Sequence, residues 1–314
     1  MHMSDETALT GKVALVAGAT RGAGRAIAVE LARSGAYVYA TGRSSRTGGP
    51  SEIGRPETIE ETGDLITAVG DGVGLVVDHE DTEQVAGLIE QIRSERGRLD
   101  ILINDIFGGD RYADWEHPLW ESDLAGGLRM LRMGVDTHLI TARYGIALML
   151  EDPHPGGLLV EMTDGTHEFN SNFREGVGMF YDLVKANVER ILMGLTYELR
   201  EQPVTPVAVT PGWLRSENML DGYGVAEENW RDACVKMPGF AISESPTYVA
   251  RGVAAMAADS AVTDLAGQVL TSRRLSNRYG VTDTDGSRPD CWTYLSENGP
   301  ASVGGDTGNI AAYR

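Results

Sequence analysis

A tyrosine and a lysine in the second half of the chain have the spacing of an acid–base pair. Tyr181 and Lys185 are four positions apart, so on a helix their side chains extend from the same face. The phenol of tyrosine has an ordinary pKa of about 10 and transfers protons poorly at neutral pH. A neighbouring ammonium group favours the phenolate and lowers that pKa. The pair therefore predicts a tyrosine that passes a proton to or from a substrate oxygen.

The residues around this pair indicate the helix that it needs. Apolar side chains recur on the same face with the helical period, at Val188, Leu192, Leu195 and Leu199. We therefore expect a helix over 179–200 with one face buried. Such a helix would hold the phenol and the ammonium group side by side.

A glycine-rich turn near the start of the chain could bind phosphate groups. Gly18, Gly22 and Gly24 lie between an expected strand, 13–17, and an expected helix, 24–34. Gly18 permits a tight turn, Gly22 lets the backbone approach a pyrophosphate, and Gly24 allows the helix to pack closely on the strand. The N–H groups and the dipole at the start of the helix attract phosphate. A strand, this turn and a helix in succession predict a dinucleotide cofactor.

The end of the second expected strand favours the phosphorylated cofactor. Sites that prefer NAD(H) have an acidic residue here that binds the ribose hydroxyls, but this chain has Thr41, followed by Arg43. Arg21, in the glycine turn, lies on the same side. Two guanidinium groups suit a 2′-phosphate, so we predict NADP(H), with NAD(H) as the alternative.

The rest of the chain alternates short apolar runs with longer helical patterns, and this rhythm is typical of a doubly wound parallel α/β sheet, the Rossmann fold. We expect about seven strands, at 13–17, 37–41, 73–77, 101–103, 158–162, 204–209 and 268–271. Helices on both faces are expected at 24–34, 58–69, 82–96, 135–150, 179–200 and 245–259. The whole chain is predicted to be a single domain with its core at about 11–271.

Three segments depart from this rhythm. Residues 44–55 are rich in Gly, Ser and Arg and are interpreted as a loop insertion. Residues 213–242 are rich in aromatic side chains and lack periodicity, so we expect an irregular substrate lid. Residues 272–314 are interpreted as a mostly irregular extension that wraps this domain or a neighbouring subunit.

These motifs resemble those of the short-chain dehydrogenase/reductase family. The glycine spacing, Tyr181-x3-Lys185 and Pro211-Gly212 match that family's patterns, and the resemblance extends from about residue 11 to about residue 271. Residues 267–286 also resemble the member-one type of dehydrogenase/reductase within the family. The family's Asn-Asn-Ala-Gly motif is altered here, because only its first Asn, Asn104, is present.

The resemblance implies a role for each matching position. Tyr181 would be the acid–base and Lys185 would bind the nicotinamide ribose. Thr163 would take the place of the family's serine and orient the carbonyl, with Asp164 as the alternative. The family's catalytic Asn would fall at Arg132 or Met133, neither of which is equivalent. The cofactor would contact Gly18, Arg21, Gly22, Ala23, Gly24, Arg43, Ser44, Asp78, His79, Asn104, Asp105, Ile106, Tyr181, Lys185, Pro211, Gly212 and Trp213.

These observations predict an NADP(H)-dependent oxidoreductase that interconverts a carbonyl and a secondary alcohol by hydride transfer. Two alternatives remain open. One is a dinucleotide-binding regulatory protein without catalytic activity, which the missing serine and Asn would suit. The other is an NAD-dependent alcohol dehydrogenase. The family also implies a homodimer or homotetramer.

Composition excludes several other classes of partner. The formal charge is −19, and a surface so acidic repels nucleic acid and anionic lipid. The six histidines and two cysteines lack the spacing of metal ligands, so no metal site is expected. The first residues, 1–6, lack the features of a signal peptide, and no apolar run is long enough for a membrane span. We therefore expect a cytoplasmic protein.

Overall fold

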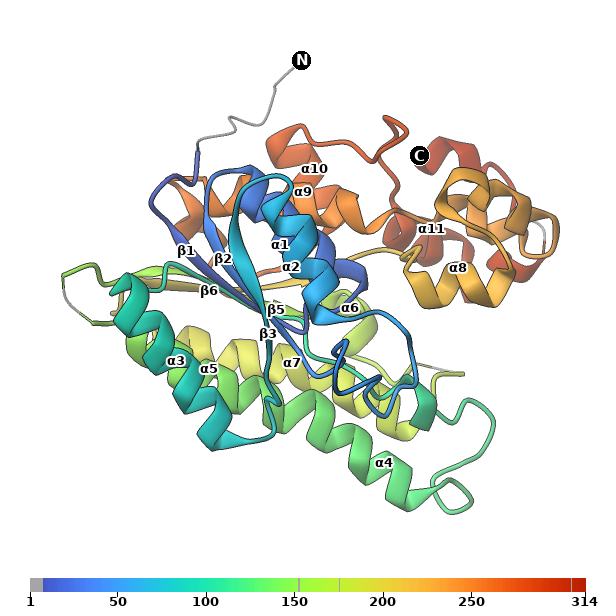
Figure 1. The fold of residues 1–314 in the computed structure, drawn as a ribbon. Helices are drawn as coiled ribbons and strands as arrows, with labels where there is room; N and C mark the ends of the chain where they lie inside the picture. The colour runs from blue at the N-terminus through green and yellow to red at the C-terminus, as the bar shows by residue number, and fades with distance from the viewer. Residues whose placement is uncertain (1–7, 152, 175, 306) are drawn as a thin grey trace.

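The computed structural model describes residues 8–151, 153–174, 176–305 and 307–314, so the start of the chain used to judge targeting lies outside it. Seven parallel strands form one sheet in the order β3-β2-β1-β4-β5-β6-β7 (Figure 1). This arrangement confirms the predicted doubly wound sheet. Because the strand order reverses at β1, the crevice beside the carboxyl ends of β1 and β4 is the expected ligand site. The strands are β1 Val13–Ala17, β2 Tyr37–Gly42, β3 Asp71–Val76, β4 Ile101–Asn104, β5 Gly157–Met162, β6 Val204–Thr210 and β7 Val269–Thr271.

Helices cover both faces of the sheet (Figure 1). One face carries α1 (Gly22–Arg33), α2 (Ile59–Thr67), α9 (Pro246–Ala257) and α10 (Ser272–Tyr279). The other carries α3 (Thr82–Arg96), α5 (Thr137–Met149) and α7 (Met179–Glu198). None of the helices within the described ranges is long and apolar enough to cross a membrane.

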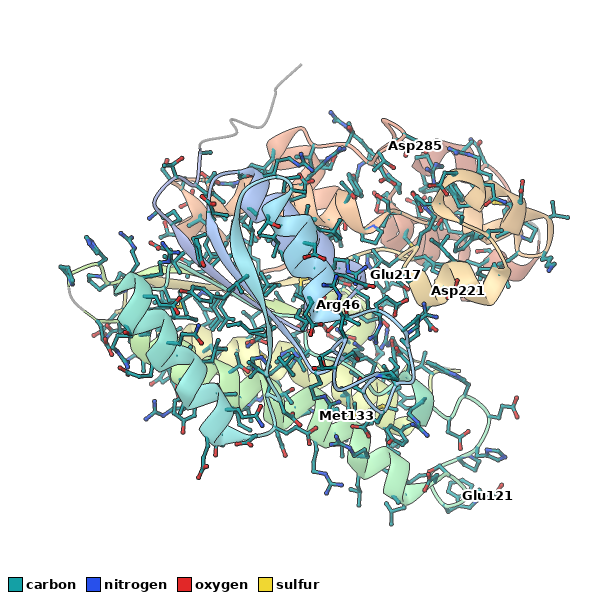
Figure 2. All side chains as sticks on the ribbon, in the orientation of Figure 1. Arg46, Glu121, Met133, Glu217, Asp221 and Asp285 are labelled. Atoms are coloured by element: carbon teal, nitrogen blue, oxygen red, sulfur yellow. The ribbon has the colours of Figure 1, made fainter. Side chains whose placement is uncertain are left out.

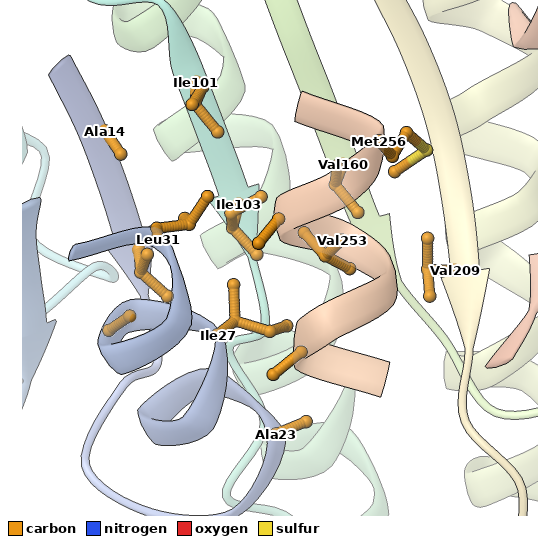
Figure 3. Close-up of a cluster of buried hydrophobic side chains, with 14 of the residues drawn as sticks. Ala14, Ala23, Ile27, Leu31, Ile101, Ile103, Val160, Val209, Val253 and Met256 are labelled. Carbon is orange, nitrogen blue, oxygen red and sulfur yellow. The ribbon is translucent and has the colours of Figure 1, made fainter. Parts of the chain in front are cut away.

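The core under α1 and α9 fixes the position of the glycine turn. Ile27 and Leu31 of α1 and Val253 of α9 are fully buried against Ile103 of β4 and Val209 of β6 (Figure 3). Burying an aliphatic side chain of this size stabilises the fold by about 1.5–3 kcal/mol. The first turn of α1 is therefore held firmly over the carboxyl end of β1.

The helix before β5 is longer than its sequence pattern predicts. It begins with α4 (Leu124–Leu131), passes through a π-helical turn at Arg132–Asp136 and continues as α5. The prediction of a start near residue 135 was wrong, because Gly126 and Gly127 weaken the helical pattern, although both are buried within α4. A π-helical turn inside a helix is frequent at functional sites.

Residues 213–242, expected to be irregular, are helical instead. They form α8 (Glu217–Tyr223) and two 3₁₀ segments, Glu227–Val235 and Pro238–Ile242. The buried Trp230 and Phe240 give the segment an apolar core of its own. The helices are short and their apolar contacts join distant positions, so no single period is visible in the sequence.

The extension is also more ordered than predicted. Besides α10, which packs on α9, it contains α11 (Cys291–Asn298). α11 and the short helices after it pack on the segment 213–242 of the same chain (Figure 1). The fully buried guanidinium of Arg215 joins the two parts: it lies 2.7 Å from Glu227 and 3.3 Å from Asp283 of the extension. The expectation of a mostly irregular tail was therefore wrong.

Candidate active site

A cavity of about 600 Å³ opens at the carboxyl end of the sheet, a size usual for small-molecule sites. It extends from the glycine turn to the start of α7 and is closed by residues 213–219 and by α11. Every predicted site residue lines it except Gly24 and Asn104. The sheet thus brings together the glycine turn and Tyr181, which are far apart in the sequence.

The glycine turn has the close packing that a phosphate cradle needs. Gly18 has φ of +88°, and a Cβ there would lie 2.2 Å from the carbonyl oxygen of Asp105. A Cβ on Gly24 would lie 2.4 Å from the carbonyl oxygen of Gly18, so only glycine lets α1 pack this closely on the turn. Gly22 also has positive φ, at +58°. The turn therefore fits the roles predicted for its three glycines.

One carboxylate occupies part of this cradle. The N–H of Gly22, the first residue of α1, donates a hydrogen bond of 2.9 Å to Oε2 of Glu217. Glu217 is the first residue of α8 and lies at the end of that helix nearest the sheet (Figure 2). A carboxylate at a helix N-terminus takes the position that suits a phosphate. The turn thus shows its capacity to bind an anion with a side chain of the protein itself.

The predicted 2′-phosphate site contains more negative charge than the sequence pattern suggests. Arg21 and Arg43 both line the cavity, as predicted. The guanidinium of Arg43, however, lies 3.2 Å from Glu52, 3.2 Å from Glu80 and 3.7 Å from Asp78. Arg43 is therefore paired with carboxylates of the surrounding loops.

Two further residues predicted to contact the cofactor, His79 and Asn104, form hydrogen bonds with other side chains of the protein. His79 lines the cavity, but its ring nitrogens bond Thr41 at 2.8 Å and Thr141 at 2.7 Å, and burial lowers its pKa to about 3. Asn104 lies beneath the cavity instead of in its wall, because its amide donates to Glu161 at 2.9 Å. In this structure Asn104 supports the cavity wall through Glu161, and its contact with the cofactor stays a prediction.

Tyr181 and Lys185 lie on α7, as the helical pattern predicts, and both line the cavity. The Tyr181 hydroxyl donates a hydrogen bond of 2.9 Å to Asp164. Burial and the charge of Asp164 raise the pKa of Tyr181 well above its ordinary value, so the expected lowering was wrong for this structure. The Lys185 ammonium lies 3.8 Å from the ring centre of Phe107 and 5.6 Å from that of Tyr181.

Of the two candidates for the serine position, Asp164 contacts the tyrosine. The Thr163 hydroxyl donates instead to the backbone carbonyl of Lys185, at 3.0 Å. Asp164 also lies 3.3 Å from the guanidinium of Arg174. The register is therefore the one in which Asp164 faces Tyr181 and Thr163 supports the helix turn that carries Lys185.

A buried ion pair at the wall of the cavity, between His138 and Glu161, was not predicted from the sequence. Nδ1 of His138 lies 2.5 Å from Glu161, and Nε2 lies 3.1 Å from the carbonyl oxygen of Ile106. Both partners are acceptors, and only the protonated imidazole donates from both nitrogens. Burial acts to lower the pKa of His138, but Glu161 outweighs it and raises the pKa. The one sequence signal for this pair is a glutamate within an otherwise apolar strand, β5.

Comparisons with known proteins agree with this geometry. A family model described as Enoyl-(Acyl carrier protein) reductase matches residues 18–271. Dehydrogenase/reductase SDR family member 1 from Homo sapiens is 32% identical, covering 97% of this chain and 93% of its own. Its counterpart from Mus musculus is 32% identical, covering 88% of this chain and 85% of its own.

A solved structure shares the fold. The hydroxysteroid dehydrogenase from Escherichia coli superposes with a TM-score of 0.65 at 19% identity, covering 86% of this chain and 98% of its own. The sequence relatives, the family model and this fold agree with the motifs around Gly18 and Tyr181. The chain belongs to the short-chain dehydrogenase/reductase family of oxidoreductases.

Proposed function

We propose that the protein is an NADP(H)-dependent oxidoreductase that interconverts a carbonyl and a secondary alcohol. The observation that carries this proposal is the placement of Tyr181 and Lys185 in the wall of the cavity that begins at the glycine turn. A phenol, an ammonium group and a phosphate cradle in one cavity suit proton transfer beside a bound nucleotide.

The chain's own residues would bind and orient the reactants. The turn from Gly18 to Gly22 would hold the pyrophosphate, and Lys185 would hold the ribose next to the nicotinamide. When bound, the cofactor supplies or accepts the hydride. Tyr181 would donate its hydroxyl proton to the substrate carbonyl oxygen, which replaces Asp164 as the acceptor of that hydrogen bond. In the opposite direction the Tyr181 oxygen would receive the alcohol proton.

The preference for NADP(H) over NAD(H) is supported by the charges near β2. Arg21 and Arg43 line the cavity, while the position usually acidic in NAD(H) sites is Thr41. The Thr41 hydroxyl bonds His79, which burial keeps neutral at physiological pH. The end of β2 itself therefore offers no carboxylate to a ribose hydroxyl.

The test is turnover of NADPH with a panel of ketones and aldehydes, comparing the wild type with Tyr181→Phe. We expect the variant to lose at least about 100-fold in kcat, because general acid catalysis contributes factors of this size. Its Kd for NADPH should stay within a few-fold of the wild type. Equal rates in the two proteins would refute the role of Tyr181.

A second candidate is a cofactor-binding protein without redox activity. It is favoured by the bond from Tyr181 to Asp164, because a phenol held by a carboxylate and with a raised pKa is a poor acid–base at neutral pH. Tight NADPH binding without turnover across the panel, in both wild type and Asp164→Ser, would support this alternative.

We also propose that the protein forms a cytoplasmic homodimer or homotetramer. Apolar side chains on the outer faces of α4, α5 and α7 support this: Leu128 is 45% exposed, Leu139 49% and Met193 55%. A second copy of the chain would cover them. Sedimentation velocity would show a single species larger than 33.8 kDa.

A further inference from the structure

One carboxylate fixes the loop between β2 and α2 across the cavity. Glu52 lies 2.5 Å from Arg129 of α4, and its second oxygen accepts a hydrogen bond of 2.7 Å from the Tyr112 hydroxyl. The same side chain lies 3.2 Å from Arg43. The neighbouring Ser51 and Ile53 line the cavity, so the loop closes the end of the cavity near β2.

The charges around Arg43 sum to a negative value, which disfavours the approach of another anion. Two guanidinium groups, those of Arg43 and Arg129, face the three carboxylates of Glu52, Asp78 and Glu80. A phosphate that approaches Arg43 therefore meets a cluster with one excess negative charge. Contact between a phosphate and Arg43 is therefore strengthened when a carboxylate gives up its own contact with Arg43.

Glu52 is the carboxylate best able to do so, because it would keep both Arg129 and Tyr112, whereas Glu80 would keep Arg129 without a hydroxyl donor such as Tyr112. If it leaves Arg43, its oxygens retain Arg129 and Tyr112, so the charge remains paired. These partners keep the pKa of Glu52 low, at about 2, with the Arg129 hydrogen bond as the largest cause. Asp78 is held differently, because its Oδ1 accepts the backbone N–H of Glu80 at 3.0 Å within a tight turn.

We propose that Glu52 competes with the 2′-phosphate of NADP(H) for Arg43 and so sets how strongly the site distinguishes NADP(H) from NAD(H). Arg129 is a positioning residue in this exchange, because it holds Glu52 when Arg43 is given up. The inference rests on the proposed use of NADP(H). It assigns a role in cofactor selection to the loop that the sequence indicates only as an insertion.

The experiment measures Kd for NADPH and for NADH by fluorescence titration of the full chain. We expect Glu52→Gln to tighten NADPH about fivefold, since one competing charge is removed, and to change NADH less than about twofold. The matched control is Glu201→Gln, which removes the same charge from a side chain that is 82% exposed. The control should leave the ratio of the two Kd values unchanged.

A double variant isolates the pair. Once Arg43 is replaced in Arg43→Gln, adding Glu52→Gln should no longer tighten NADPH. An unchanged ratio of Kd values in Glu52→Gln, or the same tightening in both backgrounds, would overturn the competition. A wild type that binds NADH more tightly than NADPH would instead refute the proposed cofactor preference, while tightening of NADPH by Glu52→Gln would still support the competition.

Discussion

The backbone N–H of Gly22 donates a hydrogen bond of 2.9 Å to the carboxylate of Glu217, although the two residues are 195 positions apart. Gly22 begins α1 and Glu217 begins α8, so the bond joins the phosphate cradle to the segment that closes the cavity. Arg25 of α1 lies 3.7 Å from the same carboxylate. The position of α8 is therefore linked to what occupies the glycine turn.

Removal of this carboxylate's charge should tighten both cofactors equally. In Glu217→Gln the N–H of Gly22 is released more readily, and the pyrophosphate that would replace Glu217 is common to NADPH and NADH. We expect both Kd values to fall by about two- to fivefold. Titration of both cofactors checks this, and a shift in only one of them would show that Glu217 acts elsewhere.

The carboxylate beside Tyr181 should set the pH dependence of catalysis. Asp164 raises the pKa of Tyr181 by its charge and by accepting the hydroxyl, so its removal lowers that pKa. In Asp164→Asn we expect the kcat/KM of alcohol oxidation to increase with pH from a value about one pH unit lower than in the wild type. The pH profile of kcat/KM measures this, with Asp182→Asn as the control, because Asp182 pairs with Arg174. Identical profiles in Asp164→Asn and the wild type would contradict the prediction.

The ion pair of His138 and Glu161, at the wall of the cavity, predicts a dependence of stability on pH. The pKa of His138 is raised in the folded protein, so its pairing with Glu161 stabilises the fold fully below the unfolded value of about 6.5. That contribution is lost as pH rises through the raised value. His138→Gln should therefore lower Tm most at pH 6 and least at high pH, measured by thermal unfolding from pH 5 to 9.

The cost of losing one partner should be large, about 3–5 kcal/mol, because a buried charge is left unpaired. His167→Gln is a suitable control. His167 also pairs with a carboxylate, Glu189, but its side chain is 68% exposed. If His138→Gln lowers Tm by the same amount at every pH, the cause is a packing defect rather than a lost ion pair.

The buried carboxylate of Glu244, next to Gly212, predicts a second decrease of stability with rising pH. Burial raises the pKa of Glu244 to about 8 from 4.5, although Ser272 donates a hydrogen bond to it. The folded protein thus binds an extra proton between these values, and stability decreases as pH rises from about 4.5 to about 8. Glu244→Gln, which keeps an acceptor for Ser272, should flatten the fall in Tm over this range. A curve parallel to that of the wild type would show that Glu244 is ionised in the folded state.

The fold and half of the site were predictable because their signals are local. The strand, turn and helix around Gly18 lie within a few residues of one another, and Tyr181 and Lys185 are separated by one helical turn. Short-range backbone geometry determines both patterns. The expected alternation of strands and helices along the chain was confirmed for the same reason.

The electrostatic environment could not be predicted, because it is built by contacts between distant segments. The sequence does not show which carboxylates pair with Arg43, because only the folded chain brings Glu52 and Glu80 to it. The choice between Thr163 and Asp164 depended on one residue of register at the end of β5, which no periodic pattern determines.

The buried guanidinium of Arg215 has a consequence for how the cavity opens. It stacks 4.3 Å from the ring centre of Trp230 and bonds the carbonyl oxygen of Ser243, besides its two carboxylate partners. Segments that contact the same buried charge are expected to open together, because the movement of one segment alone would leave the buried charge without a partner. The backbone amides of residues 213–242 and of the extension should therefore exchange with solvent hydrogen as one cooperative unit. The segments that close the cavity would then move together instead of unfolding one residue at a time.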